Sequence, residues 1–156
     1  MIKYRFRRFF MIFEQEDIGF SQDDRIPSGH LMIVLSRGKG KLIGYFSGLD
    51  SSSYYLYKLY LISASEKNAV LTKVCKVKPS KNRVRVEWEF DPWNVGGSLK
   101  RINDFNVAAL MVYGQGLPLL SCPLAAYRGE KVNWRKGLMK AMSMNNYLKS
   151  PKKTSL

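Results

Sequence analysis

Basic and aromatic residues alternate near the start of the sequence, a pattern that suits a nucleic-acid-binding strand. In an extended strand, the period of two places Lys3, Arg5 and Arg7 on one face, where their charges could follow successive phosphates. Neighbouring tyrosine and phenylalanine rings could stack on bases. The sequence contains no RNP-type motif, however, and the same charges suit an edge strand that lysine and arginine keep soluble. Both interpretations stay open.

A glycine-containing loop carries a second group of positive charges. Arg37, Lys39 and Lys41 alternate with Gly38 and Gly40, which can adopt positive φ angles and therefore predict a hairpin turn. If this hairpin lies beside the first strand, its cations extend the basic face. The loop does not match a triphosphate-binding Walker sequence, because that sequence leads into a helix and a strand is predicted here.

Residue types that usually carry catalysis or hold metals form no recognisable motif. His30 is the single histidine, and no nucleophile or carboxylate motif accompanies it. Cys75 and Cys122 lie in apolar strand contexts, which favours two free, inert thiols over a disulfide. Five acids within residues 14–24 could gather around calcium, but their spacing is not that of an EF-hand, and pairing with the chain's own cations is favoured. We therefore predict no enzyme activity, no metal and no cofactor.

Strands must position these residues. Residues 83–90 alternate charged and apolar side chains, which predicts a half-buried strand with Val84, Val86, Trp88 and Phe90 toward the core. Other runs rich in β-branched and aromatic residues follow turn signals at residues 4–13, 31–35, 41–47, 54–62, 69–77, 107–113 and 117–122. Short connections favour antiparallel neighbours. We predict an all-β antiparallel β-sandwich of seven or eight strands with immunoglobulin-like architecture; a partly open barrel is the alternative.

Two segments have helical character. Residues 98–104 are expected to form one or two turns, with Ser98 as the N-cap and with Ile102 and Phe105 facing inward. Residues 137–148 group leucine and methionine loosely on one side, which favours docking onto the domain or disorder over membrane binding. We expect a β-sandwich domain over residues 1–135 and a basic helical or flexible extension over residues 136–156.

The overall composition limits the class of protein. A chain of 156 residues with 46% hydrophobic residues can bury one core. The 26 lysines and arginines against 12 acids give a net charge of +14, which favours polyanionic partners. No apolar run approaches the roughly 20 residues that cross a bilayer. We expect a soluble, cytoplasmic protein without a membrane partner.

Several segments spread over residues 7–135 together carry a family resemblance. They are Arg-Arg-Phe-Phe-Met-Ile-Phe-Glu-Gln-Glu-Asp at 7–17, Gly-Phe at 19–20, Pro-Ser-Gly at 27–29, Tyr-Lys-Leu-Tyr-Leu-Ile at 57–62, Trp-Glu-Phe-Asp-Pro at 88–92, Asn-Val-Gly-Gly at 94–97, Phe-Asn-Val-Ala-Ala at 105–109, Cys-Pro-Leu at 122–124 and Tyr-Arg-Gly-Glu-Lys-Val-Asn-Trp-Arg at 127–135. They resemble the amino-terminal domain of an uncharacterised family from clostridia and related spore-forming bacteria. The resemblance implies a bacterial cytoplasmic protein and a domain boundary near Arg135, and the family has no assigned activity.

These observations favour a non-enzymatic interaction module that mediates protein–protein or assembly contacts. Exposed strand edges or an aromatic surface would contact an unidentified protein partner or a second copy of the chain. The alternative is a nucleic-acid-binding domain that uses Lys3, Arg5, Arg7 and the loop with Arg37, Lys39 and Lys41.

Overall fold

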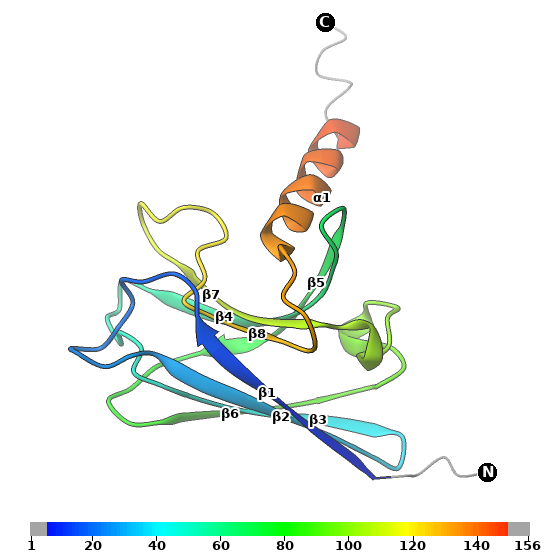
Figure 1. The fold of residues 1–156 in the computed structure, drawn as a ribbon, viewed down its shortest axis with the longest axis horizontal. Helices are drawn as coiled ribbons and strands as arrows, with labels where there is room; N and C mark the ends of the chain where they lie inside the picture. The colour runs from blue at the N-terminus through cyan, green and yellow to red at the C-terminus, as the bar shows by residue number, and fades with distance from the viewer. Residues whose placement is uncertain (1–5, 150–156) are drawn as a thin grey trace, which may run out of the picture.

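A computed structural model describes the backbone of residues 6–149 and the side chains of residues 6–143. Strands β1 to β8 span Arg7–Gln15, Ser28–Ser36, Lys39–Ser47, Leu56–Ala64, Ala69–Val77, Val84–Phe90, Val107–Tyr113 and Leu124–Tyr127, and helix α1 spans Trp134–Lys149 (Figure 1). Two short 3-10 helices, η1 (Val95–Gly97) and η2 (Ile102–Asp104), lie between β6 and β7. The predicted antiparallel β fold with a short C-terminal helix is confirmed.

The strands form one continuous antiparallel sheet with the order β5-β4-β7-β8-β1-β2-β3-β6. Strand β1 joins its two halves, because residues 7–12 pair with β2 and residues 13–15 pair with β8. Figure 1 shows β1 crossing diagonally from one half of the sheet to the other. The sheet curls until its end strands, β5 and β6, contact each other. The result is a nearly closed, barrel-like sheet.

This architecture differs from the predicted immunoglobulin-like sandwich of two separate sheets, and the partly open barrel is the closer description. The expectation that a short connection joins antiparallel neighbours is wrong for β5 and β6, which lie at opposite ends of the strand order. The connection at residues 78–83 instead carries the chain across the remaining opening of the barrel. Curling of the sheet brings its two ends together, and this depends on the whole sheet rather than on the connection.

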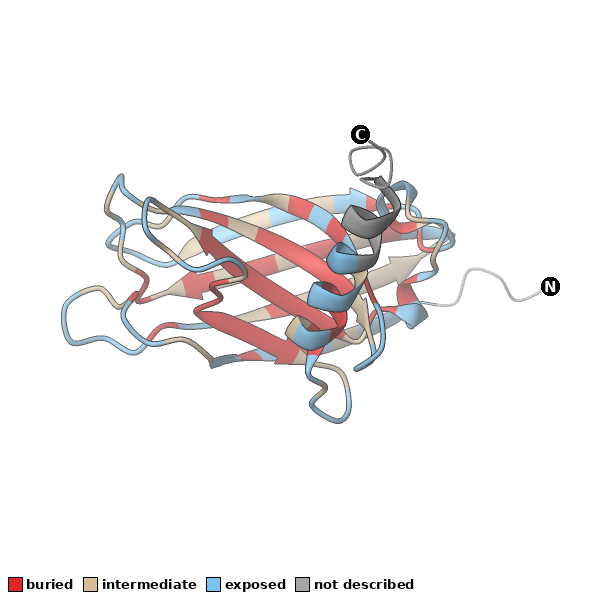
Figure 2. Cartoon of the chain, turned by 90° about the horizontal axis from the view of Figure 1, so that it is seen from above, coloured by how far each residue is buried: buried red, intermediate tan, exposed pale blue. Residues whose placement is uncertain are grey.

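The main hydrophobic core fills the space between the two halves of the sheet. Strands around it contribute fully buried side chains, among them Leu31, Leu42, Leu59 and Leu110. A second cluster lies under α1, where Trp134 and Leu138 pack on the outer face of β4 and β7. Figure 2 shows buried residues running along the strands that α1 crosses. Helix α1 therefore packs on the sheet through its first turns.

The clearest sequence pattern forms the strand that it predicts. In β6, Arg85 and Glu87 are exposed, Phe90 is buried, and Val86 and Trp88 are half-buried against the core. Ile102 and Phe105 are buried, as predicted. The alternate burial of β6 confirms the period of two that its sequence predicts.

Two local predictions are wrong. Residues 117–122 form a loop instead of a strand, because Leu120 has a φ angle of 65° and the Ser121 hydroxyl donates to the Pro118 carbonyl at 2.7 Å, closing a turn. The eighth strand, β8, follows this loop. Ser98 does not cap a helix: the helical turn is η2, and the Ser98 hydroxyl accepts a hydrogen bond from the Lys100 amide at 3.1 Å.

Candidate interaction surface on the outer face of the sheet

The outer face of β1 exposes large apolar side chains. Met11 and Phe13 point into the core, so Phe10 and Ile12 point outward by the period-two alternation of a strand. Phe10 is 58% exposed and Ile12 is 72% exposed. A strand that is apolar on both faces must bury its second face elsewhere or present it to a partner.

Strand register extends this apolar face across β2 and β3. Phe10 lies opposite Met32, which lies opposite Ile43. In the adjacent row, Ile12 lies opposite His30, and His30 lies opposite Tyr45. The residues contributed by β2 and β3 are half-buried. We call this patch, made of Phe10, Ile12, His30, Met32, Ile43 and Tyr45, the outer apolar face.

An open pocket of about 530 Å³ lies at one end of the outer apolar face. The rings of His30 and Tyr45 form part of its wall, with their centroids 5.1 Å apart. The Arg83 guanidinium lies 4.4 Å from the centroid of the Tyr45 ring. The Ser28 and Ser47 hydroxyls in its lining hydrogen-bond to each other at 3.0 Å. The lining residues contain no acid and no cysteine, so His30 lies among aromatic, apolar and hydroxyl groups and Arg83.

Positive charge borders the outer apolar face. The Arg8 guanidinium lies 5.9 Å from the Phe10 ring. On β3 and β6, one carboxylate serves two cations, because Glu87 pairs with Lys41 at 3.0 Å and with Arg85 at 2.7 Å. Hydrogen bonds from these two cations lower the pKa of Glu87. Glu89 lies opposite Lys41 and adds a second carboxylate, so the border keeps a small excess of positive charge through Arg8 and Arg83.

The structure describes one of the three predicted basic residues at the start of the chain. Lys3 and Arg5 lie outside the described residues, and Arg7 is exposed at the start of β1. Arg7 shares the strand phase of the core residue Met11, so Arg8 rather than Arg7 lies beside the outer apolar face. The predicted phase of the basic residues therefore does not coincide with the exposed apolar surface.

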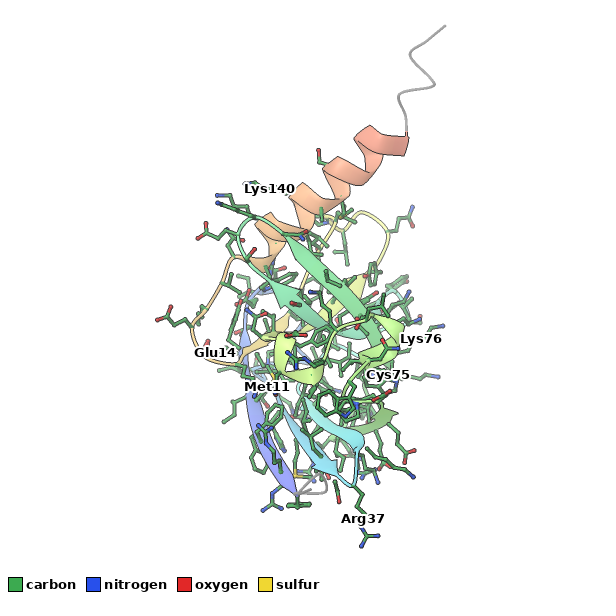
Figure 3. The ribbon with its side chains drawn as sticks, turned by 90° about the vertical axis from the view of Figure 1, so that its right-hand side faces the viewer. Met11, Glu14, Arg37, Cys75, Lys76 and Lys140 are labelled. Carbon is green, nitrogen blue, oxygen red and sulfur yellow. The ribbon has the colours of Figure 1, made fainter. Side chains whose placement is uncertain are left out.

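The predicted basic loop is the β2–β3 hairpin. Arg37 and Gly38 form its turn, both with positive φ angles, and Figure 3 shows Arg37 at its tip. Register places Arg7 opposite Leu35, so the hairpin and the start of β1 lie at the same end of the sheet. Lys39 and Lys41 line a hollow of about 690 Å³ at this hairpin.

Two acids share that hollow with the hairpin cations. Glu89 and Asp91 line it together with Arg37, Lys39 and Lys41. Lys41 is already paired with Glu87. The hairpin is therefore a mixed-charge surface, which weakens the phosphate-binding pattern that its sequence predicts.

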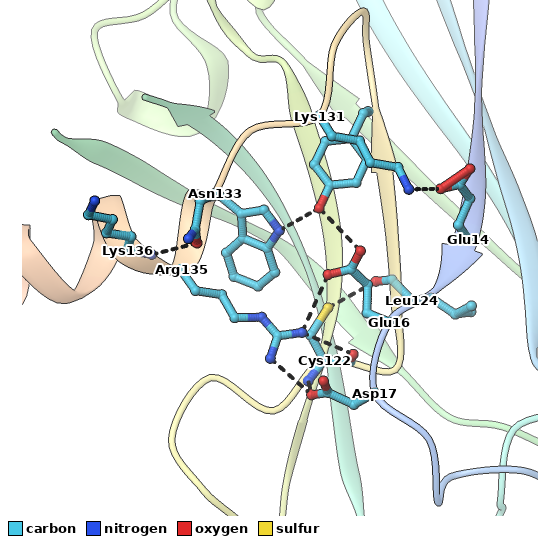
Figure 4. A network of polar contacts seen from close by, with 11 residues as sticks. Glu14, Glu16, Asp17, Cys122, Leu124, Lys131, Asn133, Arg135 and Lys136 are labelled. Carbon is cyan, nitrogen blue, oxygen red and sulfur yellow. Dashed lines mark hydrogen bonds and ion pairs between the residues drawn. The ribbon is translucent and has the colours of Figure 1, made fainter. Parts of the chain in front are cut away.

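The acids at the end of β1 and just after it pair with the chain's own cations (Figure 4). The Arg135 guanidinium donates to the Asp17 carboxylate at 3.1 Å and to the Glu16 carboxylate at 3.5 Å. Lys131 pairs with Glu14 at 2.7 Å. Among the described residues, no group of three or more histidine, cysteine or acidic side chains could hold a metal ion. These acids hold the start of α1 against the end of β1.

Hydrogen bonds made by the polar groups of two aromatic side chains continue this network toward the core. The buried Trp134 indole donates to the Tyr127 hydroxyl at 3.1 Å, and that hydroxyl donates to the Glu16 carboxylate at 3.2 Å. Burial and the adjacent Glu16 raise the pKa of Tyr127 to about 12. The network therefore joins β1, β8 and α1 with a phenol that stays protonated at neutral pH.

Both cysteines are free, as the sequence favoured. Cys122 is fully buried, and its thiol donates to the Leu124 carbonyl at 3.1 Å. Burial raises the pKa of both thiols. Since the thiolate is the reactive form, both groups should react slowly in the folded protein.

We therefore expect a thiol-specific disulfide reagent at about pH 8 to modify Cys75 slowly and Cys122 only after unfolding. Spectrophotometry of the released thiolate gives the number of groups modified with time. Denaturation in guanidinium chloride should expose two thiols per chain. In a Cys75→Ser variant the folded protein should stay unmodified, and fast labelling of that variant would contradict the burial of Cys122.

The exposed apolar residues that form the outer face were not identified from the sequence as a site. The signal was the run from Phe9 to Phe13, in which both strand phases are apolar. Such a run fits a central strand as well as an exposed surface, so the sequence alone did not distinguish them. The position of β1 in the curled sheet decides the question.

The fold and this surface define a class of protein: a nearly closed, barrel-like β domain with an apolar outer face bordered by cations. The chain belongs to the family described as Domain of unknown function (DUF7922), whose model matches residues 7–144. The match agrees with the predicted resemblance to an uncharacterised family. No curated protein and no solved structure matches the chain. Among the described residues, no helix combines the length and apolar character needed to cross a membrane.

Proposed function

We propose that this chain is a protein-interaction module that binds a partner through the outer apolar face of β1, β2 and β3. The observation that carries the proposal is the exposure of Phe10 and Ile12 within an apolar surface that continues across three strands. Exposed apolar patches with a polar border are typical of protein-binding surfaces, because covering them removes apolar area from water.

The composition of this face favours a protein over a nucleic acid. Three of its six residues, Ile12, Met32 and Ile43, are aliphatic or thioether side chains, which pack against apolar partner residues but offer no aromatic ring to a base. Aromatic, methionine and arginine residues are also enriched in the cores of protein interfaces. The excess of positive charge at the border favours a partner with acidic residues around an apolar centre.

A capture experiment tests the proposal. The full chain serves as bait in a native lysate of its source, beside a variant that carries Phe10→Ser and Ile12→Ser. We expect a saturable protein partner whose apparent affinity falls at least about tenfold in the variant, because buried aromatic and aliphatic anchors supply much of the binding energy.

The matched control is Ile18→Ser, which removes an exposed isoleucine, 82% accessible, that lies outside the outer apolar face. This control should capture the partner as well as the native chain does. Equal capture by all three proteins would show that the outer apolar face is not the binding surface.

A second candidate function is the binding of single-stranded nucleic acid. The observation that favours it is the contact of arginines with rings, since Arg8 lies near Phe6 and Phe10, and Arg83 lies over Tyr45. The cations predicted for this role are Lys3, Arg5, Arg7, Arg37, Lys39 and Lys41. A titration of fluorescent single-stranded DNA and RNA should then show binding that weakens steeply with salt. Absence of binding at low salt would exclude this function.

A further inference from the structure

The first half of β1 has one unpaired edge. Residues 7–12 pair with β2 on one side, whereas β8 reaches β1 only at residues 13–15. After β8 ends at Tyr127, the chain turns away from β1. The Arg128 amide donates at 2.9 Å to the carbonyl of Asn106, which precedes β7. In the described part of the chain, no strand pairs with the second edge of residues 7–12. Such an edge is a template for an additional strand.

A hydrogen bond at the end of β1 shows which peptide groups face this edge. Just after β1, the Glu16 amide donates to the Pro123 carbonyl at 2.9 Å on the β8 side, and the chain then bends, so that the Asp17 amide donates to the Cys122 carbonyl at 3.0 Å. Peptide groups alternate in direction along a strand, so even-numbered residues share this orientation. The amides of Arg8, Phe10 and Ile12 therefore point toward the unpaired edge.

The β2–β3 hairpin gives the same assignment independently. In a two-residue hairpin the residues that flank the turn, here Ser36 and Lys39, form a hydrogen-bonded pair. Alternation then turns the even residues of β2 toward β3 and the odd ones toward β1. Since odd residues of β2 lie opposite odd residues of β1, residues 7, 9 and 11 bond to β2. The even residues of β1 again face the unpaired edge.

Arginines gather along this edge. Arg7 and Arg8 begin the segment, and the Arg128 guanidinium lies 4.3 Å from the Phe9 ring. Burial and the nearby Arg7 lower the pKa of Arg128. The Nη1 atom of Arg128 is buried and makes no hydrogen bond within the described residues. None of the ion pairs among residues 6–143 involves these three arginines.

We propose that residues 7–12 of β1 accept an extended acidic segment of a partner protein as an additional strand. This inference rests on the proposed protein-binding function and specifies the conformation and charge of the partner. Backbone hydrogen bonds to Arg8, Phe10 and Ile12 hold the added strand. Its acidic side chains meet arginines that have no acidic partner, and its apolar side chains continue the outer apolar face.

Nuclear magnetic resonance tests the proposal with a synthetic peptide that alternates valine and glutamate. Bound peptide should slow hydrogen exchange at the amides of Arg8, Phe10 and Ile12 by about tenfold or more, because they gain hydrogen bonds. Exchange at residues 7, 9 and 11 should stay unchanged, since those amides already bond to β2. A peptide with lysine in place of glutamate is the control and should not bind. Unchanged exchange at the three even residues would overturn the proposal.

A pair of variants separates the backbone contact from the side-chain contact. Phe10→Ala and Phe10→Pro both remove the ring, but proline also removes the amide hydrogen that faces the unpaired edge. The affinity for the valine–glutamate peptide should be about tenfold lower in Phe10→Pro than in Phe10→Ala. Equal affinities would argue against strand addition. Thermal unfolding checks that both variants fold, and the exchange experiment on the native chain decides the matter if the proline variant does not.

Failure of this inference is distinguishable from failure of the proposed function. If substitution of Phe10 and Ile12 by serine abolishes partner capture but the peptide protects no even-numbered amide, the function stands and strand addition falls. If the peptide protects those amides while partner capture is insensitive to the substitutions, strand addition stands and the outer apolar face is not the binding surface. Light scattering tests whether the native chain associates with itself through β1. Self-association without peptide binding would show that the added strand comes from a second copy of the chain, and it would overturn the proposal of an acidic partner segment.

Discussion

Replacing Trp134 with alanine is expected to lower the free energy of unfolding by about 3–5 kcal/mol, as is typical for truncation of a buried tryptophan. The Trp134 side chain is 1% exposed and belongs to the cluster under α1. Its indole also donates the hydrogen bond to Tyr127 that continues to Glu16. Truncation removes apolar packing and leaves the phenol without its indole donor, so both losses add to the destabilisation.

Chemical denaturation followed by circular dichroism measures this loss. Met139→Ala is the matched control, because Met139 lies on the same helix but is 52% exposed, and it should change stability by less than about 0.5 kcal/mol. Trp134→Phe keeps part of the packing but removes the indole donor, so its loss of unfolding free energy should lie between those of Trp134→Ala and Met139→Ala. If Trp134→Ala were as stable as the control, α1 would not be an integral part of the domain.

Replacing Gly137 with alanine is expected to destabilise the protein by about 1–3 kcal/mol, although alanine favours helices. Gly137 lies where α1 crosses the connection between β4 and β5. An added Cβ would collide with the Ser65 carbonyl oxygen and would lie 2.8 Å from the Asn68 carbonyl oxygen. Both obstacles are backbone atoms, so the helix itself must move away, and the packing of Trp134 and Leu138 is loosened with it.

The sign of the stability change in Gly137→Ala tests whether α1 is docked on the β4–β5 connection. In an exposed helix position, replacing glycine by alanine stabilises by up to about 1 kcal/mol, so destabilisation at Gly137 reports the close approach of helix and hairpin. Ser143→Ala, at an exposed position of α1, is the control and should be neutral or slightly stabilising. A stabilised Gly137→Ala variant would contradict the docked position of the helix.

These two variants also test where the domain ends. The sequence placed the boundary after residue 135, which lies within α1 and just beyond the two helix residues that contact the cluster and the polar network. Trp134 packs in the cluster under the helix, and Arg135 pairs with Asp17 near the end of β1. Large effects on stability would extend the cooperative unit to Leu138, because its side chain is buried in the same cluster.

Local patterns predicted most strands because alternation depends on neighbouring residues alone. The strand at 83–90 was identified from its charged and apolar alternation, and β5 and β7 have the predicted bounds. The short strand β8 was missed, because its sequence, Leu-Ala-Ala-Tyr, is too small and uniform to show a period. The segment is a strand because it pairs with β7 on one side and β1 on the other, and not because of its own β propensity.

The candidate site could be predicted only in part. The sequence pointed to cations near the start of the chain and in the hairpin, and the structure does bring Arg7 and that hairpin to the same end of the sheet. The sequence could not show that Lys41 pairs with Glu87, 46 positions later, or that Arg83 lies over Tyr45. Contacts between distant strands depend on register, which a single sequence does not contain.

The sequence by itself determined the antiparallel β class and a hairpin loop within residues 36–40, because these follow from local periodicity and backbone preference. It also favoured two free thiols, because both cysteines lie in apolar strand contexts. Tertiary structure decided which face of β1 is exposed. Phe9 to Phe13 are apolar on both strand phases, so burial of Met11 and exposure of Ile12 depend on how the sheet curls around one core. It also decided that residues 7–12 keep an unpaired edge, since β8 turns toward β7 after meeting β1 at residues 13–15.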